Sequence, residues 1–573
     1  MSAFETMDMG RQRDLLPLPL LEYEHSDAAA LQAGRGHLSV GAHRRLVRRT
    51  GNISMANEVI EAINGMAGFS SPKDGAPTVN QQHSMSSILG HVSSLPRSEV
   101  CMSTREAVRE LLQCNPFSPY DTGEGSGTTV RPYKKELVSL PEVGASVMDA
   151  SELVDETGRR ILEAYQQSML KEDDFLEDPK GVTTYMDEEL RESSSLYHEF
   201  VANLYNRNML DFSHTCHSVV TPFFVAKKDN RLRLVLDCRT SNSFFVSPPE
   251  MAMPAGYSFS QVQMDSEDQM YIAQSDIRDY FYSIGMPEEL RSDFCLPQVD
   301  LRLVAPHHPL CQSNEGAVLI YPVMKVVPMG WNWAMYLSQR IHMYQAMQAA
   351  QVGVDRVVVD SRPVPKLSKE VPFLLVPYAD NLNILGIDKQ AVQQAKIRIV
   401  SHLQQLGFRT HEEQDAELTA EALGFLLDGQ KGRVLPRPRK RDRTRKVLLW
   451  LAEQPKVSGR MLERVIGHCI HFFMLRRECL SIFRSVYDFK QRHYEQRVTL
   501  WKSAAMECRQ AAALLLMCYS DLKREWHQEV TCSDASLSGT GVCAGVFPID
   551  DIRQIGSQRE LWRYRTRDAA QRT

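Results

Sequence analysis

The stretch "FLLVPYADNLNILGI", Phe373 to Ile387, constrains the fold more than any other part of the sequence. Two apolar runs flank one short polar segment that contains Asp380 and Asn381. Such runs are typical of strands buried on both faces, and the Asp-Asn pair between them predicts a tight hairpin turn. Because an unpaired buried carboxylate is unfavourable, Asp380 must be exposed at the turn, paired with a cation or bound to a metal.

The bulk composition excludes some classes of protein. The chain has 573 residues and a formal net charge of −5, so nucleic-acid binding would need local basic patches. No apolar run reaches the ~18 residues of a membrane span, and the N-terminus lacks the apolar core of a secretory signal. The 12 cysteines form no CxxC pair. We therefore expect reduced thiols in an intracellular protein of the nucleus or cytoplasm, without a membrane partner.

Composition shifts divide the chain into four predicted regions. Residues 1–185 are rich in loop and linker composition and are expected to be partly disordered, with short helices. Within them, Ser103 and Glu106 form a capping box that predicts a helix, and a second helix is expected over 150–170. The remaining predicted regions are a mixed α and β segment over 186–436, a mostly helical segment over 437–526 and a strand-bearing segment over 527–573.

The mixed segment alternates strand and helix patterns. A helix is expected where Leu196, Phe200 and Leu204 recur four residues apart. Short strands among helices predict an α+β fold with an antiparallel sheet. The sequence predicts a hairpin over "SVVTPFFVAKKDNRLRLVLDCR", a strand over "MYIAQSDIRDYFYSI", and helices over "WNWAMYLSQRIHMYQAMQAA" and "AVQQAKIRIVSHLQQLGF".

Six short motifs follow one another in a characteristic order: "PFFVAKKDNRLRLVLDCRTSN", "SDIRDYFYSIGMP", "VPMGWNWAMYLSQ", "PYADNLNILG", "LQQLGFRTHEE" and "EALGFLLDGQKGRVLP". Their order and spacing resemble the fingers and palm of retroelement reverse transcriptases, closest to the DIRS and long-terminal-repeat types, from roughly Asn208 to Pro436. The resemblance implies a right-hand polymerase fold of palm, fingers and helical thumb. It also implies an RNA-directed DNA polymerase that uses dNTPs and an RNA or DNA template-primer.

Nucleotidyl transfer explains why the motifs carry carboxylates. Two Mg²⁺ ions roughly 3.5–4 Å apart hold the attacking and leaving oxygens, and Mg²⁺ prefers carboxylate ligands. The resemblance implies that Asp276 and Asp380 bind Mg²⁺, with Mn²⁺ as an alternative ion. The family motif is Tyr-x-Asp-Asp, whereas this chain has Tyr378, Ala379, Asp380 and Asn381. Asn381 would be a weakened third ligand, because an amide oxygen carries no charge.

The resemblance also implies substrate contacts. Lys227 and Arg233 would hold the triphosphate, since their donors match its oxygens. Phe281 would reject a 2′-hydroxyl and so favour deoxynucleotides. The backbone near Asp279 would cradle the triphosphate. Taken singly, Phe281 is also typical of a core aromatic, and charges at a hairpin tip are usually only solvated.

Two further motif residues complete the expected substrate site. Tyr378 belongs to the same motif as Asp380. Gly330 in "PMGWNWA" would let the backbone approach the nascent base pair closely. Met329 replaces the usual glutamine of that motif, which removes one amide from the template side.

Three C-terminal features carry weaker signals. The basic run "KGRVLPRPRKRDRTRK" predicts contact with a primer-template backbone, with a solvated linker or a nuclear-targeting patch as alternatives. His468 and His471 are expected to pack within a helix rather than bind metal. "VTCSDASLSGTGVCAGVF" resembles the start of a ribonuclease H domain, with Asp534 as its first carboxylate. We expect a truncated ribonuclease H-like segment without hydrolytic activity.

Two rival functions stay open. Asn381 and Met329 favour a catalytically impaired, retroelement-derived protein that only binds nucleic acid. RNA-templated RNA synthesis is the other rival, and Phe281 argues against it.

Overall fold

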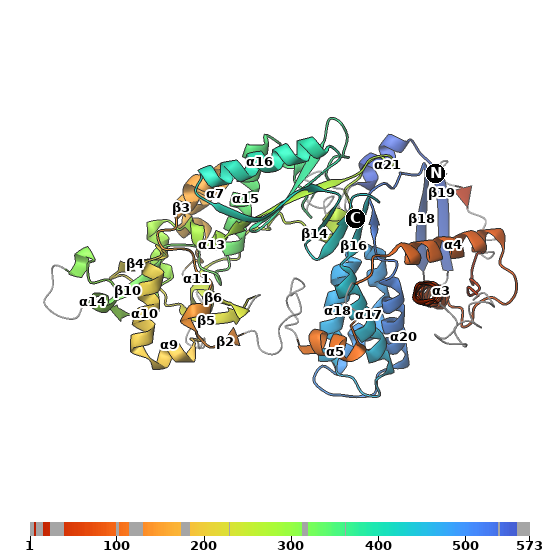
Figure 1. Ribbon diagram of the computed structural model, residues 1–573, viewed down its shortest axis with the longest axis horizontal. Coiled ribbons are helices and arrows are strands. Elements are labelled where there is room, and N and C mark those ends of the chain that lie inside the picture. Colours follow the sequence, from red (N-terminus) through yellow and green to blue (C-terminus); the bar gives the residue numbers. More distant parts are fainter. Residues whose placement is uncertain are drawn as a thin grey trace.

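An antiparallel sheet in the order β11-β12-β7-β13, here called the central sheet, organises the fold (Figure 1). Helices α15 (Ala334–Ala350) and α16 (Lys389–Gln405) contact it. The computed structural model describes residues 5–6, 15–22, 39–98, 102–113, 130–172, 184–227, 230–311, 319–360, 362–536 and 539–557. The strands of the central sheet are β7 (Tyr271–Arg278), β11 (Phe373–Tyr378), β12 (Asn381–Gly386) and β13 (Arg409–Glu417).

Both faces of the central sheet are buried, as the apolar runs predict. Along β11, Phe373 and Leu375 belong to a core shared with α15 and α16. Leu374 and Val376 belong to a second core shared with the C-terminal helices. Because neighbouring side chains of a strand point to opposite faces, β11 must be apolar at every position.

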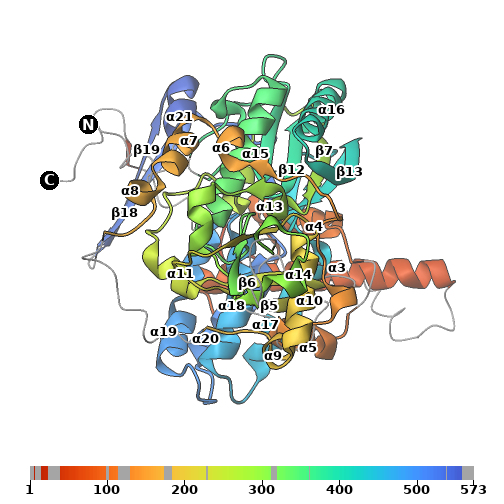
Figure 2. The same cartoon turned by 90° about the vertical axis from the view of Figure 1, so that its left-hand side faces the viewer.

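A lobe of short strands lies beside the central sheet, and Figure 2 views the molecule from this side. The expected hairpin is confirmed as β5 (Thr221–Ala226) and β6 (Leu232–Asp237), here called the hairpin lobe. The expected amphipathic helix is α9 (Glu188–Glu192) followed by α10 (Ser194–Tyr205). The other short elements between residues 206 and 330 are β4 (Leu210–Ser213), α11 (Arg239–Phe244), α12 (Gly256–Phe259), α13 (Tyr280–Ser283), β8 (Ile284–Gly285), β9 (Val299–Asp300), α14 (Leu301–Val304) and β10 (Leu319–Met324). Of these, α12 packs in the core shared with the C-terminal helices rather than in the lobe.

The mostly helical segment is confirmed. A small sheet, β14-β15-β16-β17, lies between the central sheet and these helices. Its strands are β14 (Thr419–Ala422), β15 (Phe425–Asp428), β16 (Arg433–Pro436) and β17 (Ser520–Asp521). The helices, here called the helical bundle, are α17 (Pro438–Glu453), α18 (Gly459–Phe473), α19 (Arg484–Arg492) and α20 (Lys502–Leu514), with the 3₁₀ helix η9 (Arg477–Ile482).

The N-terminal region differs from its prediction. Residues 40–66 form one long helix, α3 (Val40–Met66), so the expectation of short helices only is wrong there. With α4 (Val79–Ser94) it packs on the helical bundle. The Asn64 side chain accepts a hydrogen bond from Leu18 N (2.7 Å) and donates one to Leu18 O (2.8 Å). The composition did not predict this helix because polar residues on it, such as Asn64, are buried against an extended neighbouring segment instead of facing solvent.

The expected helix over 150–170 is wrong as a single element. It is broken into α6 (Ala150–Leu153), α7 (Glu156–Glu163) and α8 (Tyr165–Ser168). Val154 is extended, and the Asp155 carboxylate restarts the helix by accepting from Gly158 N at 3.2 Å. Asp155 also pairs with Arg340 of α15.

Residues 130–172 pack with the segments that follow 186 rather than with α3 and α4. The strand β2 (Val130–Arg131) pairs with β5, and β3 (Met148–Asp149) pairs with β8. The region 1–185 therefore divides between two parts of the molecule.

The basic run faces the N-terminal helices instead of solvent. Arg443 is only 4% exposed, and its guanidinium bonds Glu110 of α5 (Thr104–Gln113) at 3.4 Å. Arg445 pairs with Glu58 of α3. Arg441 donates to Pro96 O at 3.0 Å, just past the end of α4. This part of the run therefore holds the N-terminal helices against α17, and the expectation of a solvated linker is wrong for it.

The C-terminal segment has the expected strand character. β18 (Glu529–Ser536) pairs with β19 (Gly539–Val546), which also pairs with β1 (Glu5–Thr6), and α21 (Ile549–Gly556) follows. His468 is buried in α18 and His471 is partly buried there, with its ring stacked on Phe425 at a centroid distance of 4.7 Å. No helix within the described residues has the length and apolar character of a membrane span.

Candidate active site

The register between β7 and β12 brings the two predicted catalytic carboxylates together. Asp276 on β7 lies directly opposite Asn381 on β12. The neighbouring Ile277 N–H donates to the Asp380 carbonyl at 2.9 Å. Asp276 and Asp380 are therefore neighbours at one end of the central sheet, although 104 positions separate them in the sequence.

The turn that carries Asp380 is strained and is held from α15. Ala379 has φ +50°, a left-handed conformation that is uncommon for a residue with a Cβ. Its N–H donates to Gln339 Oε1 at 2.7 Å, and its carbonyl accepts from His342 Nδ1 at 2.6 Å. Gln339 Nε2 also donates to Pro377 O at 2.9 Å. These bonds fix both ends of the Ala379 residue and so set the position of Asp380.

His342 is suited to this structural role because it stays neutral. Complete burial lowers its pKa to about 4, so the imidazole is uncharged near neutral pH. Sequence reasoning missed both Gln339 and His342. The available signal was a pair of polar residues three positions apart in a helix that also has buried apolar positions.

Asp380 is an unfavourably placed carboxylate. The surrounding protein raises the pKa of the Asp380 carboxyl. Hydrogen bonds to its own backbone and to Asn381, and the charges of Arg233 and His411, lower this pKa but do not cancel the rise. The Asn381 Nδ2–H donates to Asp380 Oδ1 at 2.9 Å. In this arrangement the amide is a hydrogen-bond donor that orients the Asp380 carboxylate. The sequence predicted Asn381 only as a weak metal ligand, and this hydrogen bond to Asp380 was not predicted.

The third strand around the site, β13, adds residues that sequence reasoning missed. His411 lies opposite Asp276, with Nδ1 3.9 Å from Asp276 Oδ1. Arg409 Nη2 lies 3.2 Å from Asp279 Oδ2, a carboxylate that is only 9% exposed. Both residues lie in the motif "LQQLGFRTHEE", for which the sequence predicted no site residue. The β13 strand thus supplies cationic or ionisable partners to two of the predicted site residues.

The hairpin lobe presents its cations toward these carboxylates. Arg233 on β6 pairs with Val225 on β5, and Lys227 follows the end of β5. Burial, followed by the charge of Arg233, lowers the pKa of Lys227, while Asp279 and Asp276 act in the opposite direction. Arg233 also favours the ionised form of Asp380. The lobe and the central sheet therefore interact electrostatically at this site.

Phe281 lies on the short helix α13, which begins after Asp279. Asp279 has φ +54°, so the chain turns sharply there. The flanking rings are buried: Tyr280 donates its hydroxyl to Ser338 O at 2.7 Å, and Tyr282 donates to Leu234 O at 3.1 Å. Phe281 is the partly exposed ring of the three. Tyr378 is the last residue of β11 and pairs with Asn381.

Gly330 is required by packing within the chain itself. It has φ +131°, and a Cβ there would overlap the Leu236 carbonyl of β6. Leu236 N donates to Met329 O at 2.8 Å, and Asn242 Nδ2 donates to Gly330 O at 3.0 Å. The motif "PMGWNWA" therefore docks on β6 and α11, whatever further role its backbone has.

Asp534 does not join the carboxylates of the central sheet. It is exposed on β18, opposite Gly541, in a separate sheet. Within the residues the structure describes, no group of three or more His, Cys, Asp or Glu side chains could hold a metal ion. The donors at the main site are the carboxylates of Asp276 and Asp380, whose hard oxygens suit Mg²⁺ and Mn²⁺.

Comparison with known proteins finds similarity in structure but no match in sequence. No family model matches the chain, and no curated protein matches it in sequence. Among solved structures, the chain is similar to a foamy viral protease-reverse transcriptase in complex with double-stranded DNA. The similarity has a TM-score of 0.41 and 12% sequence identity, and it covers 72% of this chain and 70% of the viral chain.

We expect Gln339→Leu to destabilise the protein by roughly 2–4 kcal/mol, because it leaves Ala379 N–H and Pro377 C=O buried without partners. Urea denaturation followed by circular dichroism measures this free energy of unfolding. Gln348→Leu on the exposed face of α15 is the matched control and should change it by less than about 0.5 kcal/mol. Equal effects of the two variants would contradict the support of the turn by Gln339.

We expect Asp380→Asn to raise the melting temperature of the protein in EDTA at pH 7.5. Burial raises the folded-state pKa of Asp380, so its ionisation disfavours the folded state as pH rises through that pKa. The gain should shrink as the pH is lowered and the carboxyl becomes protonated. Asp74→Asn, at an exposed position, should show no such pH-dependent gain. A lower melting temperature for Asp380→Asn would contradict the unfavourable placement of this carboxylate.

Proposed function

We propose that this protein catalyses template-directed DNA synthesis, by transfer of the α-phosphoryl group of a dNTP to a primer 3′-hydroxyl. The observation that carries the proposal is the β7–β12 register, which makes Asp276 on β7 a neighbour of Asp380 at the tip of the β11–β12 hairpin. In this proposal the central sheet is the palm, the hairpin lobe belongs to the fingers and the helical bundle is the thumb.

Asp276 and Asp380 would hold Mg²⁺ or Mn²⁺, which supplies charge neutralisation for phosphoryl transfer. The fit rests on the donor set and on the pairing of the backbone: the two residues that carry hard carboxylates are neighbours across β7 and the β11–β12 turn, and the surrounding protein raises the pKa of Asp380. A cation bound there would offset the penalty that raises the pKa of Asp380. Asn381 would orient the Asp380 carboxylate through the hydrogen bond between their side chains.

The proposed substrate contacts follow the charges around the site. Lys227 and Arg233 would bind the triphosphate of the dNTP, since both already act electrostatically on the carboxylates. Phe281, partly exposed on α13, would exclude a 2′-hydroxyl. The backbone at Asp279 and Gly330 and the side chain of Tyr378 would position the triphosphate and the base pair of the template-primer.

A non-catalytic, nucleic-acid-binding protein is the second candidate. The observation that favours it is the Asn381 amide, which donates to Asp380 where the resembled family has a second carboxylate. A site with two carboxylates holds metal ions less strongly than a site with three.

Primer extension with dNTPs and Mg²⁺ or Mn²⁺ on an RNA or DNA template separates the two candidates. We expect incorporation by the wild-type chain, and a loss of at least a hundredfold in Asp276→Asn and Asp380→Asn, because each substitution removes a metal-binding carboxylate. Asp74→Asn should retain wild-type activity. Equal incorporation by the wild type and both site variants, or none by the wild type, would contradict the proposed function.

We expect Asn381→Asp to keep or raise Mg²⁺-dependent incorporation. The substitution replaces the amide donor to Asp380 with a like charge, so the melting temperature in EDTA should fall and the rise on adding Mg²⁺ should be larger than for the wild type. Thermal melts with and without Mg²⁺ measure both effects. A large drop in activity, together with an unchanged rise in melting temperature on adding Mg²⁺, would mean that the site requires the Asn381 amide.

A further inference from the structure

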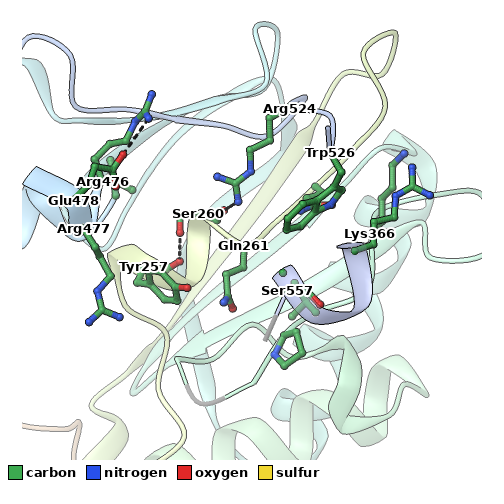
Figure 3. Close-up of a pocket in the computed structure, with 16 residues that line it drawn as sticks. Tyr257, Ser260, Gln261, Lys366, Arg476, Arg477, Glu478, Arg524, Trp526 and Ser557 are labelled. Atoms are coloured by element: carbon green, nitrogen blue, oxygen red, sulfur yellow. Dashed lines mark hydrogen bonds and ion pairs between the residues drawn. The ribbon is translucent and has the colours of Figure 1, made fainter. Parts of the chain in front are cut away.

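A second concave site lies outside the candidate active site. A cavity of about 420 Å³ opens between α12, the start of η9, the segment that follows β17 and the end of α21 (Figure 3). None of its lining residues belongs to the carboxylate site of the central sheet. Its size falls within the range of small-ligand pockets.

The lining of this cavity is strongly cationic. Five basic side chains and one acidic side chain, Glu478, contribute to it. Arg476 pairs with Glu478 at 3.1 Å, Arg553 pairs with Asp550 at 3.4 Å, and Lys366 pairs with Asp265. The remaining two basic side chains are Arg477 and Arg524.

Arg477 and Arg524 form no ion pair with any residue in the described part of the chain. Arg524 donates to the Ser260 carbonyl, a neutral partner. Surrounding protein and the nearby Arg476 charge lower the pKa of Arg524, whereas Tyr257, Asp521 and Glu478 act in the opposite direction. A ligand with at least two negative charges would relieve this repulsion.

The cavity also offers aromatic and amide groups. Trp526 is held by a hydrogen bond from its Nε1 to Gln263 Oε1 at 3.1 Å. Tyr257 faces the same space, and the guanidinium of Arg477 lies 5.1 Å from its ring centroid. Figure 3 shows the Gln261 side chain between Tyr257 and Ser557. Rings and a carboxamide are the groups that stack on a nucleobase and bind its polar edge.

We propose that this cavity binds a nucleoside polyphosphate, with Arg477 and Arg524 on the phosphates and with Tyr257, Gln261 and Trp526 on the base. A bare polyphosphate would contact the arginines alone, whereas a nucleotide would also contact the rings and the carboxamide that line the cavity. A nucleic-acid strand would need a groove that continues along its backbone, whereas this is one cavity of single-nucleotide scale. Among the described residues that line the cavity, Glu478 is the only carboxylate, so we expect nucleotide binding there to persist in EDTA.

The test uses the full chain and fluorescent N-methylanthraniloyl-ATP in EDTA, with binding followed by fluorescence anisotropy. EDTA suppresses nucleotide binding that depends on a metal, so this readout is separate from primer extension. The variants are Arg477→Gln, Arg524→Gln and the double variant. Arg398→Gln, at an exposed position on α16, is the matched control. Arg477 is exposed, so its variant is expected to fold even if the Arg524 variant does not.

We expect saturable binding by the wild type and the control, and at least tenfold weaker binding by Arg477→Gln and by the double variant. Unlabelled ATP should displace the probe at lower concentration than pyrophosphate does. Absence of saturable binding, or equal binding by all variants, would overturn the proposal. Equal displacement by pyrophosphate would remove the role of the rings, and displacement by a short single-stranded oligonucleotide at far lower concentration would reassign the site to a strand.

Discussion

The pairing of β12 with β7 is the constraint on which the candidate site depends. It sets Asp276 beside Asn381 and places Asp380 at the hairpin tip. A slip of one residue would break the hydrogen bond that Gln274 Nε2 on β7 donates to Asn383 Oδ1, directly opposite on β12, at 2.6 Å. The left-handed turn at Ala379 completes the placement, because Gln339 and His342 hold both of its backbone polar groups.

Electrostatics at this site balance one partly buried carboxylate, Asp380, against charges from separate elements. Asp380 is destabilised by burial and is offset by the Asn381 amide, Arg233 and His411. Asp279, in turn, is held by Arg409. With an amide at position 381, the metal-free site holds one negative charge fewer than a site with three carboxylates. This arrangement makes the folded protein more tolerant of an empty site, while the two carboxylates keep hard donors for a divalent cation.

Features that depend on local pattern could be predicted from the sequence. The two hairpins and the helix α15 follow from apolar periodicity, and the neighbouring placement of Asp276 and Asp380 is what the resemblance to reverse transcriptases implied. Features that depend on contacts between distant polar residues could not. The asparagines of α3 bind an extended segment, and arginines of the basic run bind Glu58 and Glu110, so polar composition concealed an ordered core. Gln339 and His342 were missed for the same reason, since their partners are backbone atoms of a turn far along the chain.

The proposed function requires that Asp276 and Asp380 form one divalent-cation site. Crystals of the wild-type chain grown or soaked with Mn²⁺ test this most directly, because the anomalous scattering of Mn²⁺ locates the ion independently of any assumption about ligands. We predict an anomalous peak in contact with a carboxylate oxygen of each residue, with the two carboxyl groups about 4 Å apart. An anomalous peak elsewhere, or none, with the two carboxylates turned apart, would contradict it.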